Sequence, residues 1–305
     1  MDSLSTAGVE FCLDVLKELN SNSAGDNVFF SPLSLLYALH MILLGAGGNS
    51  AEQIKKVLHF NHIAEASKSE FTDSLECSQA GRTHSDFGVL ISQINQLDSN
   101  YILSIANRLY GTKKMAFHQG KSVLVEMMYQ TGMFKLAVIE RPQMQVLELP
   151  YVNNRLSMLV LLPTGTTKLE QIAKQLNVRT FEKWTGPSNM VEREVEVHLP
   201  RFKLDVQYEL NSLLKSLGMT DIFNKDKADL SGMSSAKGLY LSKVIHKSYV
   251  DVNEEGTEAA AATGANIAVK RLPIRYQFTA NKPFLFLIRD NPSKMIVFCG
   301  KFASP

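Results

Sequence analysis

The sequence predicts an α+β fold, with helices in the first third of the chain and mostly antiparallel strands in the rest. Two observations support this prediction. Apolar residues recur at helical spacing in the first 60 residues, whereas from residue 101 onward they alternate or run together as they do in strands. Turn signals such as Asn153-Asn154 separate several of these strands. Helices followed by a run of strands are typical of an α+β organisation.

The composition indicates a globular protein with an ample core. The chain has 305 residues, of which 45% are hydrophobic and 20% charged, as in ordinary soluble proteins. The net charge of +2 is too small to indicate a nucleic-acid partner or a membrane surface. No apolar run approaches the length of a membrane span. We therefore expect no nucleic-acid and no membrane partner.

The cysteines and the first residues bear on the compartment. Cys12, Cys77 and Cys299 are odd in number and widely spaced, so they predict neither a disulfide framework nor a metal site. The opening residues lack the basic region and continuous apolar core of a conventional signal peptide. We expect a cytoplasmic protein, and the alternative is release without a cleaved signal peptide.

Two helices are predicted before residue 45. Apolar residues recur every four positions from Ala7 to Leu19, with Ser5 or Thr6 available as a cap. Ser31-Pro32 opens the second helix, because proline suits the first helical turn. This helix is mostly apolar through Leu44 and should be buried on most of its faces.

A glycine-rich stretch, GAGGNS at residues 45–50, separates the second helix from a third at Ala51–Phe60, which Asn49 or Ser50 would cap. A nucleotide-binding loop is the alternative for GAGGNS. That loop would follow a strand and carry a Lys-Ser or Lys-Thr pair, and both features are missing here. We interpret the stretch as a helix end followed by a helix start.

The remaining elements follow in order. Residues 166–184 predict two short helices, and residues 208–219 a helix that ends at Gly218. The last two strands, joined at Asn291-Pro292, predict a hairpin. The alternating or apolar patterns predict strands at residues 105–117, 123–130, 134–140, 144–152, 156–163, 193–206, 238–256, 284–290 and 294–302.

No motif of an enzyme or a metal site is convincing. His59 and His62 have the spacing of metal ligands, but no suitable third ligand is near, so two surface histidines are the simpler interpretation. The chain has no G-x-S-x-G, H-E-x-x-H or kinase motif. We expect neither catalytic activity nor a cofactor nor a bound metal.

The segment EEGTEAAAATGANIAVKRLP, residues 254–273, combines small side chains with a basic pair. As a strand, Thr257–Thr263 would present a uniformly small, uncharged face, which could enter a tight groove between other strands. The composition alone also fits a helical or disordered linker. The neighbouring segments decide between these interpretations.

Six segments spread along the chain resemble the serpins, and in particular their ovalbumin-type clade. The residues that carry the resemblance are NVFFSPLSLLYALHMILLGA (27–46), LELPYVNNRLSMLVLLP (147–163), EVHLPRFKLD (196–205), LSGM (230–233), VIHKSYVDVNEEGTEAAAAT (244–263) and FTANKPFLFLIRD (278–290). The resemblance implies one serpin domain, residues 1–305, that acts as a monomer. In that family an exposed reactive loop is attacked by a serine protease and then inserts into the main sheet, which traps the acyl-enzyme.

The resemblance assigns roles to residues of the loop. Lys270 and Arg271 would flank the scissile bond, and a basic residue before the bond indicates a trypsin-like partner. Cleavage after Arg271 is the alternative, because both residues are basic. The residues of the hinge, which would insert first, are Glu254, Gly256, Thr257, Glu258, Ala259, Ala260, Ala261, Ala262 and Thr263.

The resemblance also implies a polar cluster and a gap. Ser31, Ser34 and His246 match the family's shutter, where hydroxyl groups and a histidine form hydrogen bonds beneath the opening sheet. The chain is short of the family's length by about 80 residues, and the break falls between residues 119 and 120. A main-sheet strand would be missing there, and its loss would leave an unpaired edge and uncovered apolar surface. We therefore expect an incomplete main sheet, and an inhibitor that is cleaved as a substrate is the alternative function.

Overall fold

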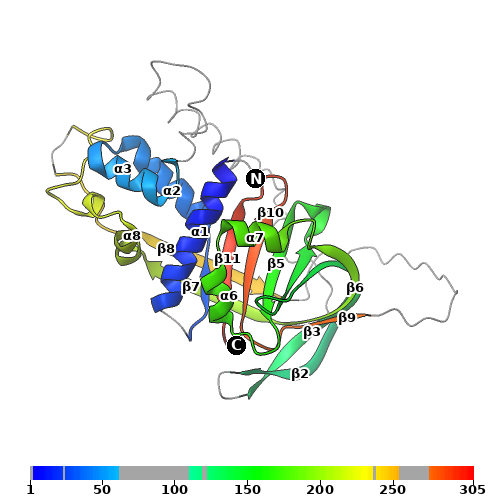
Figure 1. Ribbon diagram of the computed structural model, residues 1–305. Helices are drawn as coiled ribbons and strands as arrows, with labels where there is room; N and C mark the ends of the chain where they lie inside the picture. Colours follow the sequence, from blue (N-terminus) through cyan, green and yellow to red (C-terminus); the bar gives the residue numbers. More distant parts are fainter. Residues whose placement is uncertain (1–2, 23–24, 62–109, 119–121, 236–237, 254–274) are drawn as a thin grey trace, which may run out of the picture.

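Helices and strands separate along the chain as the sequence predicts. The computed structural model describes residues 3–22, 25–61, 110–118, 122–235, 238–253 and 275–305, and its α+β fold is shown in Figure 1. The helices among these residues are α1 (Ser3–Asn22), α2 (Pro32–Gly45), α3 (Gly48–Val57), α6 (Leu169–Gln175), α7 (Val178–Thr185) and α8 (Asn211–Leu217), with short 3-10 turns η1 (Val152–Asn154) and η2 (Asp221–Phe223).

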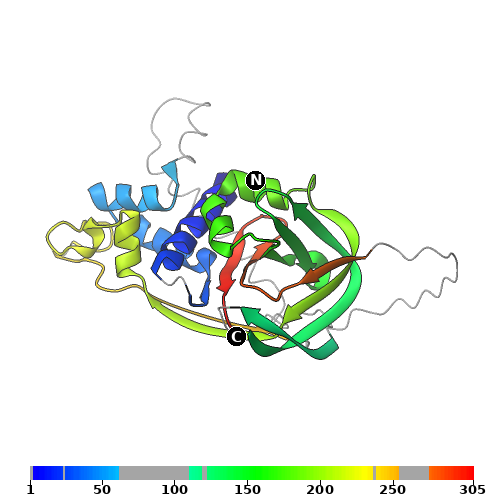
Figure 2. The same ribbon diagram turned by 60° about the horizontal axis from the view of Figure 1, so that its bottom comes forward.

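The strands form two sheets. The larger one contains β1 (Val28–Phe30), β2 (Tyr110–His118), β3 (Ser122–Ile139), β4 (Met144–Pro150), β5 (Leu156–Pro163), β6 (Val191–Pro200), β9 (Tyr276–Thr279), β10 (Phe284–Asp290) and β11 (Ile296–Phe302). Its order is β1-β11-β10-β5-β4-β3-β6-β9, with β2 paired to β3. Figure 2 shows that this sheet curls strongly at β3 and β6. The smaller sheet is the antiparallel pair β7 (Phe202–Glu209) and β8 (Ile245–Val252).

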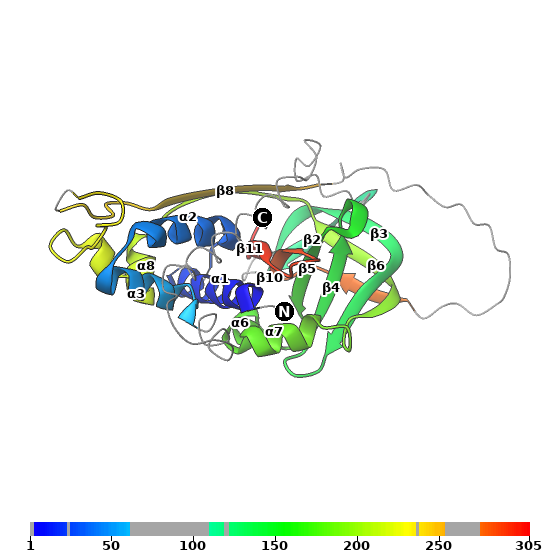
Figure 3. The same ribbon diagram turned by 90° about the horizontal axis from the view of Figure 1, so that it is seen from above.

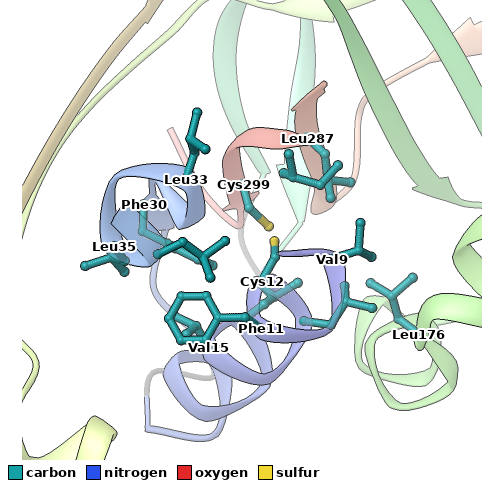
Figure 4. Packing of buried hydrophobic residues seen from close by; sticks show 14 of the residues in the cluster. Val9, Phe11, Cys12, Val15, Phe30, Leu33, Leu35, Leu176, Leu287 and Cys299 are labelled. Carbon is teal, nitrogen blue, oxygen red and sulfur yellow. The ribbon is translucent and has the colours of Figure 1, made fainter. Parts of the chain in front are cut away.

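The alternation of side chains along the central strands divides the core in two. On β10, Leu285 and Leu287 face α1 and the other helices, whereas Phe284 and Phe286 face the β7–β8 sheet. The helix-side core is completed by residues of α1 such as Val9 and Phe11 (Figure 4). The large sheet is therefore covered on both faces, which explains why β5 and β10 are buried along their whole length and are mostly apolar.

Two predicted helix starts are wrong. Helix α1 already includes Ser5 and Thr6, so neither caps it, and the Ser5 hydroxyl donates to the carbonyl of Ser293 instead. Helix α3 starts at Gly48 behind Gly47, not at Ala51. The amide of Asn49 donates to Asp221, and the hydroxyl of Ser50 accepts from the N–H of Asp229. Tertiary partners thus compete with local capping for these polar side chains.

Three predicted strands also differ from the structure. The segments 123–130 and 134–140 are one strand, β3, because β2, β6 and β4 supply ladder partners along its whole length. The segment 193–206 is two strands that separate at Arg201. Inward residues shift there from odd positions (Val195, Val197, Leu199) to even ones (Phe202, Leu204), so the chain leaves one sheet for the other.

The segment 238–256 forms a strand only at Ile245–Val252, which is β8. Upstream of β8, the N–H of Leu241 is bound to the carbonyl of Ile222, outside any ladder. The predictions for residues 105–109 and 254–256 lie outside the described residues, whereas the rest of the strand predicted at 105–117 is β2. The hairpin of β10 and β11 and the helix end at Gly218, where φ is 118°, are confirmed.

The β7–β8 sheet has an open edge within the described part of the chain. There, β8 pairs with β7 and with no other strand. Figure 3 shows β8 running past α2 along one side of the molecule. The last turns of α2 are less buried than predicted, since Met41 and Leu44 are 49% and 45% exposed. Both observations agree with an incomplete main sheet, because missing strands would otherwise pair with β8 and cover apolar surface.

Candidate functional site

The predicted reactive-loop residues lie outside the described residues. This applies to Lys270, Arg271 and the whole hinge from Glu254 to Thr263. The strands on either side of this segment are described. The preceding strand, β8, ends at Val252 in the small sheet, and the following strand, β9, pairs in parallel with β6 from Tyr276 to Thr279.

Two of the three predicted shutter residues, Ser31 and His246, meet in the structure. The backbone N–H of Ser31 donates to Nε2 of His246 over 2.9 Å. The Ser31 hydroxyl donates to the carbonyl oxygen of Val297 over 2.8 Å and accepts the N–H of Ser34 over 3.2 Å. These bonds connect the start of α2 with β8 and β11. We call the group of Ser31, Ser34, His246, Ser248 and Val297 the serine–histidine cluster.

Local sequence explains how Ser31 reaches its place. It is the N-cap of α2, with an extended backbone at φ −104° and ψ 101°, and Pro32 occupies the first helical turn. The Ser31 hydroxyl therefore accepts the N–H of Ser34 as the helix cap, and it donates its own proton to the carbonyl oxygen of Val297 on β11. Ser34 differs from the expectation. It contributes its backbone N–H, whereas its side chain is exposed.

Two members of the cluster were not predicted from the sequence. The Ser248 hydroxyl lies 2.8 Å from Nε2 of His246, and Val297 contributes its carbonyl oxygen. Ser248 follows His246 by two residues on the same strand, so the strand period places both side chains on one face. That spacing could have been used to predict Ser248. No sequence signal predicts the role of Val297, because every residue type has a backbone carbonyl oxygen.

The protonation state of His246 follows from its donors. Since the N–H of Ser31 points at Nε2, this nitrogen is the unprotonated acceptor, and the imidazole is neutral with its proton on Nδ1. Burial lowers the pKa of His246, because the charged imidazolium would lose its hydration. His246 and Ser248 are 7% and 5% exposed, so no substrate reaches this Ser–His pair. The cluster is suited to holding three elements together.

We expect the stability of the protein to fall as His246 becomes protonated. The unfolded histidine has a pKa of about 6.5, and burial places the folded value lower. Between these values the unfolded state binds more protons, so the free energy of unfolding decreases as the pH falls through this window. Urea unfolding of the wild type between pH 8 and about pH 5 should show this decrease. The variant His246→Gln should show a smaller pH dependence.

The control for this experiment is His198→Gln, which removes a half-buried histidine on β6 that lies far from the cluster in the sheet order. It should retain the pH dependence of the wild type. An equal pH dependence in wild type and His246→Gln would contradict the assignment.

Ion pairs support the outer face of the β7–β8 sheet. Lys203 lies 2.7 Å from Asp251, and Lys247 lies 3.3 Å from Asp205. The hydrogen bond to Asp251 and the attraction of its charge raise the pKa of Lys203. All four residues are substantially exposed except Asp251, so solvent screening leaves each pair only a small contribution to stability. They favour the register of the two strands without fixing the sheet to the body.

Two general features of the described residues bear on function. They contain no group of three or more histidine, cysteine or acidic side chains that could hold a metal ion. His59 instead contacts Glu10 and Asp14, at 3.3 and 2.8 Å, while His62 lies outside the described residues. None of the helices in the described ranges combines the length and apolar character needed to cross a membrane.

Comparison with known proteins gives one consistent result. The family model "Serpin (serine protease inhibitor)" matches two overlapping stretches, residues 6–120 and 111–305. Serpin B11 of Homo sapiens is 56% identical over 392 positions that cover all of both chains, and leukocyte elastase inhibitor of Equus caballus is 37% identical over 396 positions, again with full coverage. The alignment with serpin B11 thus occupies 87 more positions than the chain has residues.

A solved structure agrees with the sequence relatives. Uncleaved ovalbumin superimposes with a TM-score of 0.78 at 27% identity, covering 99% of this chain and 100% of ovalbumin. The family model, the relatives and the fold agree over nearly the whole chain. The chain belongs to the serpin family of serine protease inhibitors, in its ovalbumin-type clade.

Proposed function

We propose that this chain presents residues 254–274 as a serpin reactive loop to a trypsin-like serine protease, which attacks at Lys270–Arg271. Three observations support the proposal: membership of the serpin family, the basic pair, and the uniformly small face of Thr257–Thr263. A trypsin-like primary pocket holds an acidic group that pairs with a basic side chain before the scissile bond. The chain would be a protease substrate or inhibitor in its own right and not an enzyme, and we expect it in the cytoplasm.

One observation favours cleavage without trapping. In the described part of the chain β8 pairs with β7 alone, and its other edge has no strand beside it. A loop inserted as a new strand needs ladder partners on both sides. We therefore propose that the bait is retained, whereas the sheet that would accept the cleaved loop is incomplete. The full inhibitory cycle remains the second candidate, because the hinge keeps the small residues that insertion requires.

The pairing of β2 and β3 supports the predicted position of the gap. The register runs from Tyr110 opposite Tyr129 to His118 opposite Ser122, so the strands on both sides of the junction pair with each other. The two stretches of the family match also meet in this region, at residues 111–120. We propose that the chain is one serpin domain that lacks a family segment between residues 119 and 120, and that these strands have paired across the gap.

Incubation with catalytic amounts and then with equimolar trypsin tests the proposal. We expect cleavage at Lys270–Arg271, seen by intact mass, and no protease complex that survives a denaturing gel. A detergent-stable complex would contradict the incomplete-trap proposal and support the full inhibitory cycle. Cleavage spread over many other basic residues, with none preferred in the loop, would contradict the proposed bait.

Variants of the basic pair separate the two cleavage positions. Lys270→Ala should move the cut to the bond after Arg271. The double variant Lys270→Ala/Arg271→Ala should slow the first cleavage by about 100-fold or more, because the charged pocket of trypsin is left unpaired. The matched control is Lys174→Ala at an exposed lysine of α6, which should be cut at the wild-type rate.

A further inference from the structure

Two cysteines from opposite ends of the chain face each other in the helix-side core. Cys12 lies on α1 and Cys299 on β11, and Figure 4 shows their sulfur atoms pointing toward one another. Both thiols are free, and both side chains are fully buried. The Cys299 thiol is also one of the groups that raise the pKa of Cys12. No local sequence pattern predicts this pair, because the two residues are separated by almost the whole chain.

We propose that Cys12 and Cys299 form a reversible dithiol–disulfide pair that, once oxidised, cross-links α1 to β11. The oxidant is a low-molecular-weight disulfide such as oxidised glutathione. One cysteine thiolate attacks it, which forms a mixed disulfide and releases one small thiol. The second cysteine thiolate then attacks the protein sulfur of the mixed disulfide, which forms the Cys12–Cys299 bond and releases the second small thiol. The proposal goes beyond the proposed protease recognition and is independent of it.

The surroundings of the pair decide when this reaction is possible. Apolar side chains such as Val9, Phe11 and Leu287 belong to the same buried cluster, and the charge of Asp14 also acts on Cys12. Burial, with the neighbouring thiol and carboxylate, raises the pKa of Cys12 well above the usual value. The Cys12 thiol is thus protonated, and both thiols are out of reach of solvent while α1 is in place. Oxidation therefore requires α1 to separate from β11, during folding or during a transient opening.

The position of the bond gives it a structural consequence. Cys299 is opposite Phe30 in the β1–β11 ladder, and Phe30 immediately precedes Ser31. Two residues away on β11, the carbonyl of Val297 accepts the Ser31 hydroxyl. The cross-link would thus fasten α1 to the strand that supports the serine–histidine cluster. We expect the oxidised protein to resist opening at this place more strongly than the reduced protein.

The experiment uses the full chain with Cys77→Ser, which leaves only the two facing cysteines. The protein is unfolded, refolded in glutathione buffers of increasing oxidised fraction, quenched with an alkylating reagent and analysed by intact mass and peptide mapping. We expect a monomer that has lost two hydrogen atoms and yields a linked peptide with Cys12 and Cys299. Its Tm should exceed that of the same protein after reduction by about 5 °C or more.

Two controls complete the test. Without denaturant, alkylation of both cysteines should be about 100-fold slower than in urea, because access requires opening. Cys12→Ala and Cys299→Ala, each in the Cys77→Ser background, should form no intramolecular disulfide. Persistent alkylation of both thiols even in fully oxidising buffer, or an oxidised protein no more stable than the reduced one, would overturn the proposal.

Discussion

Replacing Asp290 with alanine is expected to lower the free energy of unfolding by about 3 kcal/mol, because it removes a fully buried charged acceptor and leaves its part-buried donors unpaired. The Asp290 carboxylate is fully buried at the end of β10. It accepts Nε of Arg155 over 2.5 Å, and the N–H and hydroxyl of Ser293 over 3.0 and 2.6 Å. These bonds connect the turn after β10 with the turn before β5. Urea unfolding of wild type and Asp290→Ala measures the loss.

The controls for Asp290 separate burial from ion pairing in general. Asp290→Asn keeps one acceptor oxygen and should cost less than the alanine variant. Lys203→Ala breaks the exposed pair with Asp251 and should lower the free energy of unfolding much less than Asp290→Ala. An Asp290→Ala loss no larger than that of Lys203→Ala would contradict the structural role of the buried pair. The turn itself has a further connection to α1, since the carbonyl of Ser293 accepts the Ser5 hydroxyl.

Replacing Phe286 with alanine is expected to cost about 3–5 kcal/mol and to loosen the β7–β8 sheet from the body. Phe286 is fully buried on β10, where its ring centroid lies 5.3 Å from that of Phe202 on β7 and 5.8 Å from that of Phe29 on β1. Phe202 also stacks on Phe302, with the centroids 4.5 Å apart. Since β7 is the only partner of β8 in the described residues, this aromatic group is a main contact of the small sheet with the large one.

Two measurements test the role of Phe286. Urea unfolding gives the loss of stability, and hydrogen exchange of the β8 amides reports whether the small sheet opens locally. We expect β8 to lose more protection than β5 at the centre of the large sheet. Tyr249→Ala removes an aromatic side chain from the exposed face of β8 and should change stability by about 0.5 kcal/mol or less. Uniform loss of protection across both sheets would contradict a local role for Phe286.

These two predictions concern β10, the strand on which the small sheet packs. The hinge of the proposed reactive loop follows β8 directly in the sequence, so β8 is the last described strand before it. A complete main sheet would hold β8 from both sides. Within the described residues, the aromatic contacts beneath β8 and the serine–histidine cluster hold this strand in place. The trypsin experiment tests whether the cleaved loop traps the protease, whereas the Phe286 variant tests how firmly the small sheet is held on the large one.

Local patterns in the sequence were sufficient wherever short-range physics dominates. Ser31-Pro32 marked the start of α2, and Gly218 marked the end of α8, because capping geometry and left-handed backbone restrict the residues that fit. The β10–β11 hairpin was equally clear. Local patterns failed at Asn49 and Ser50, whose side chains bind residues far away in the sequence. They also failed at Arg201, where the chain passes from the large sheet to the small one. At these places the competing partners are remote in sequence.

The sequence by itself determined the family, the α+β class and the side chains of Ser31 and His246 in the serine–histidine cluster, because the serpin motifs are local residue patterns spread along the chain. It also led to the prediction of an incomplete main sheet, and in the described residues β8 pairs with β7 alone. Only the tertiary structure decided that β2 pairs with β3, which carbonyl completes the cluster, and that Cys12 meets Cys299. Such contacts join residues far apart along the chain, and their energies depend on burial and register that no local pattern encodes.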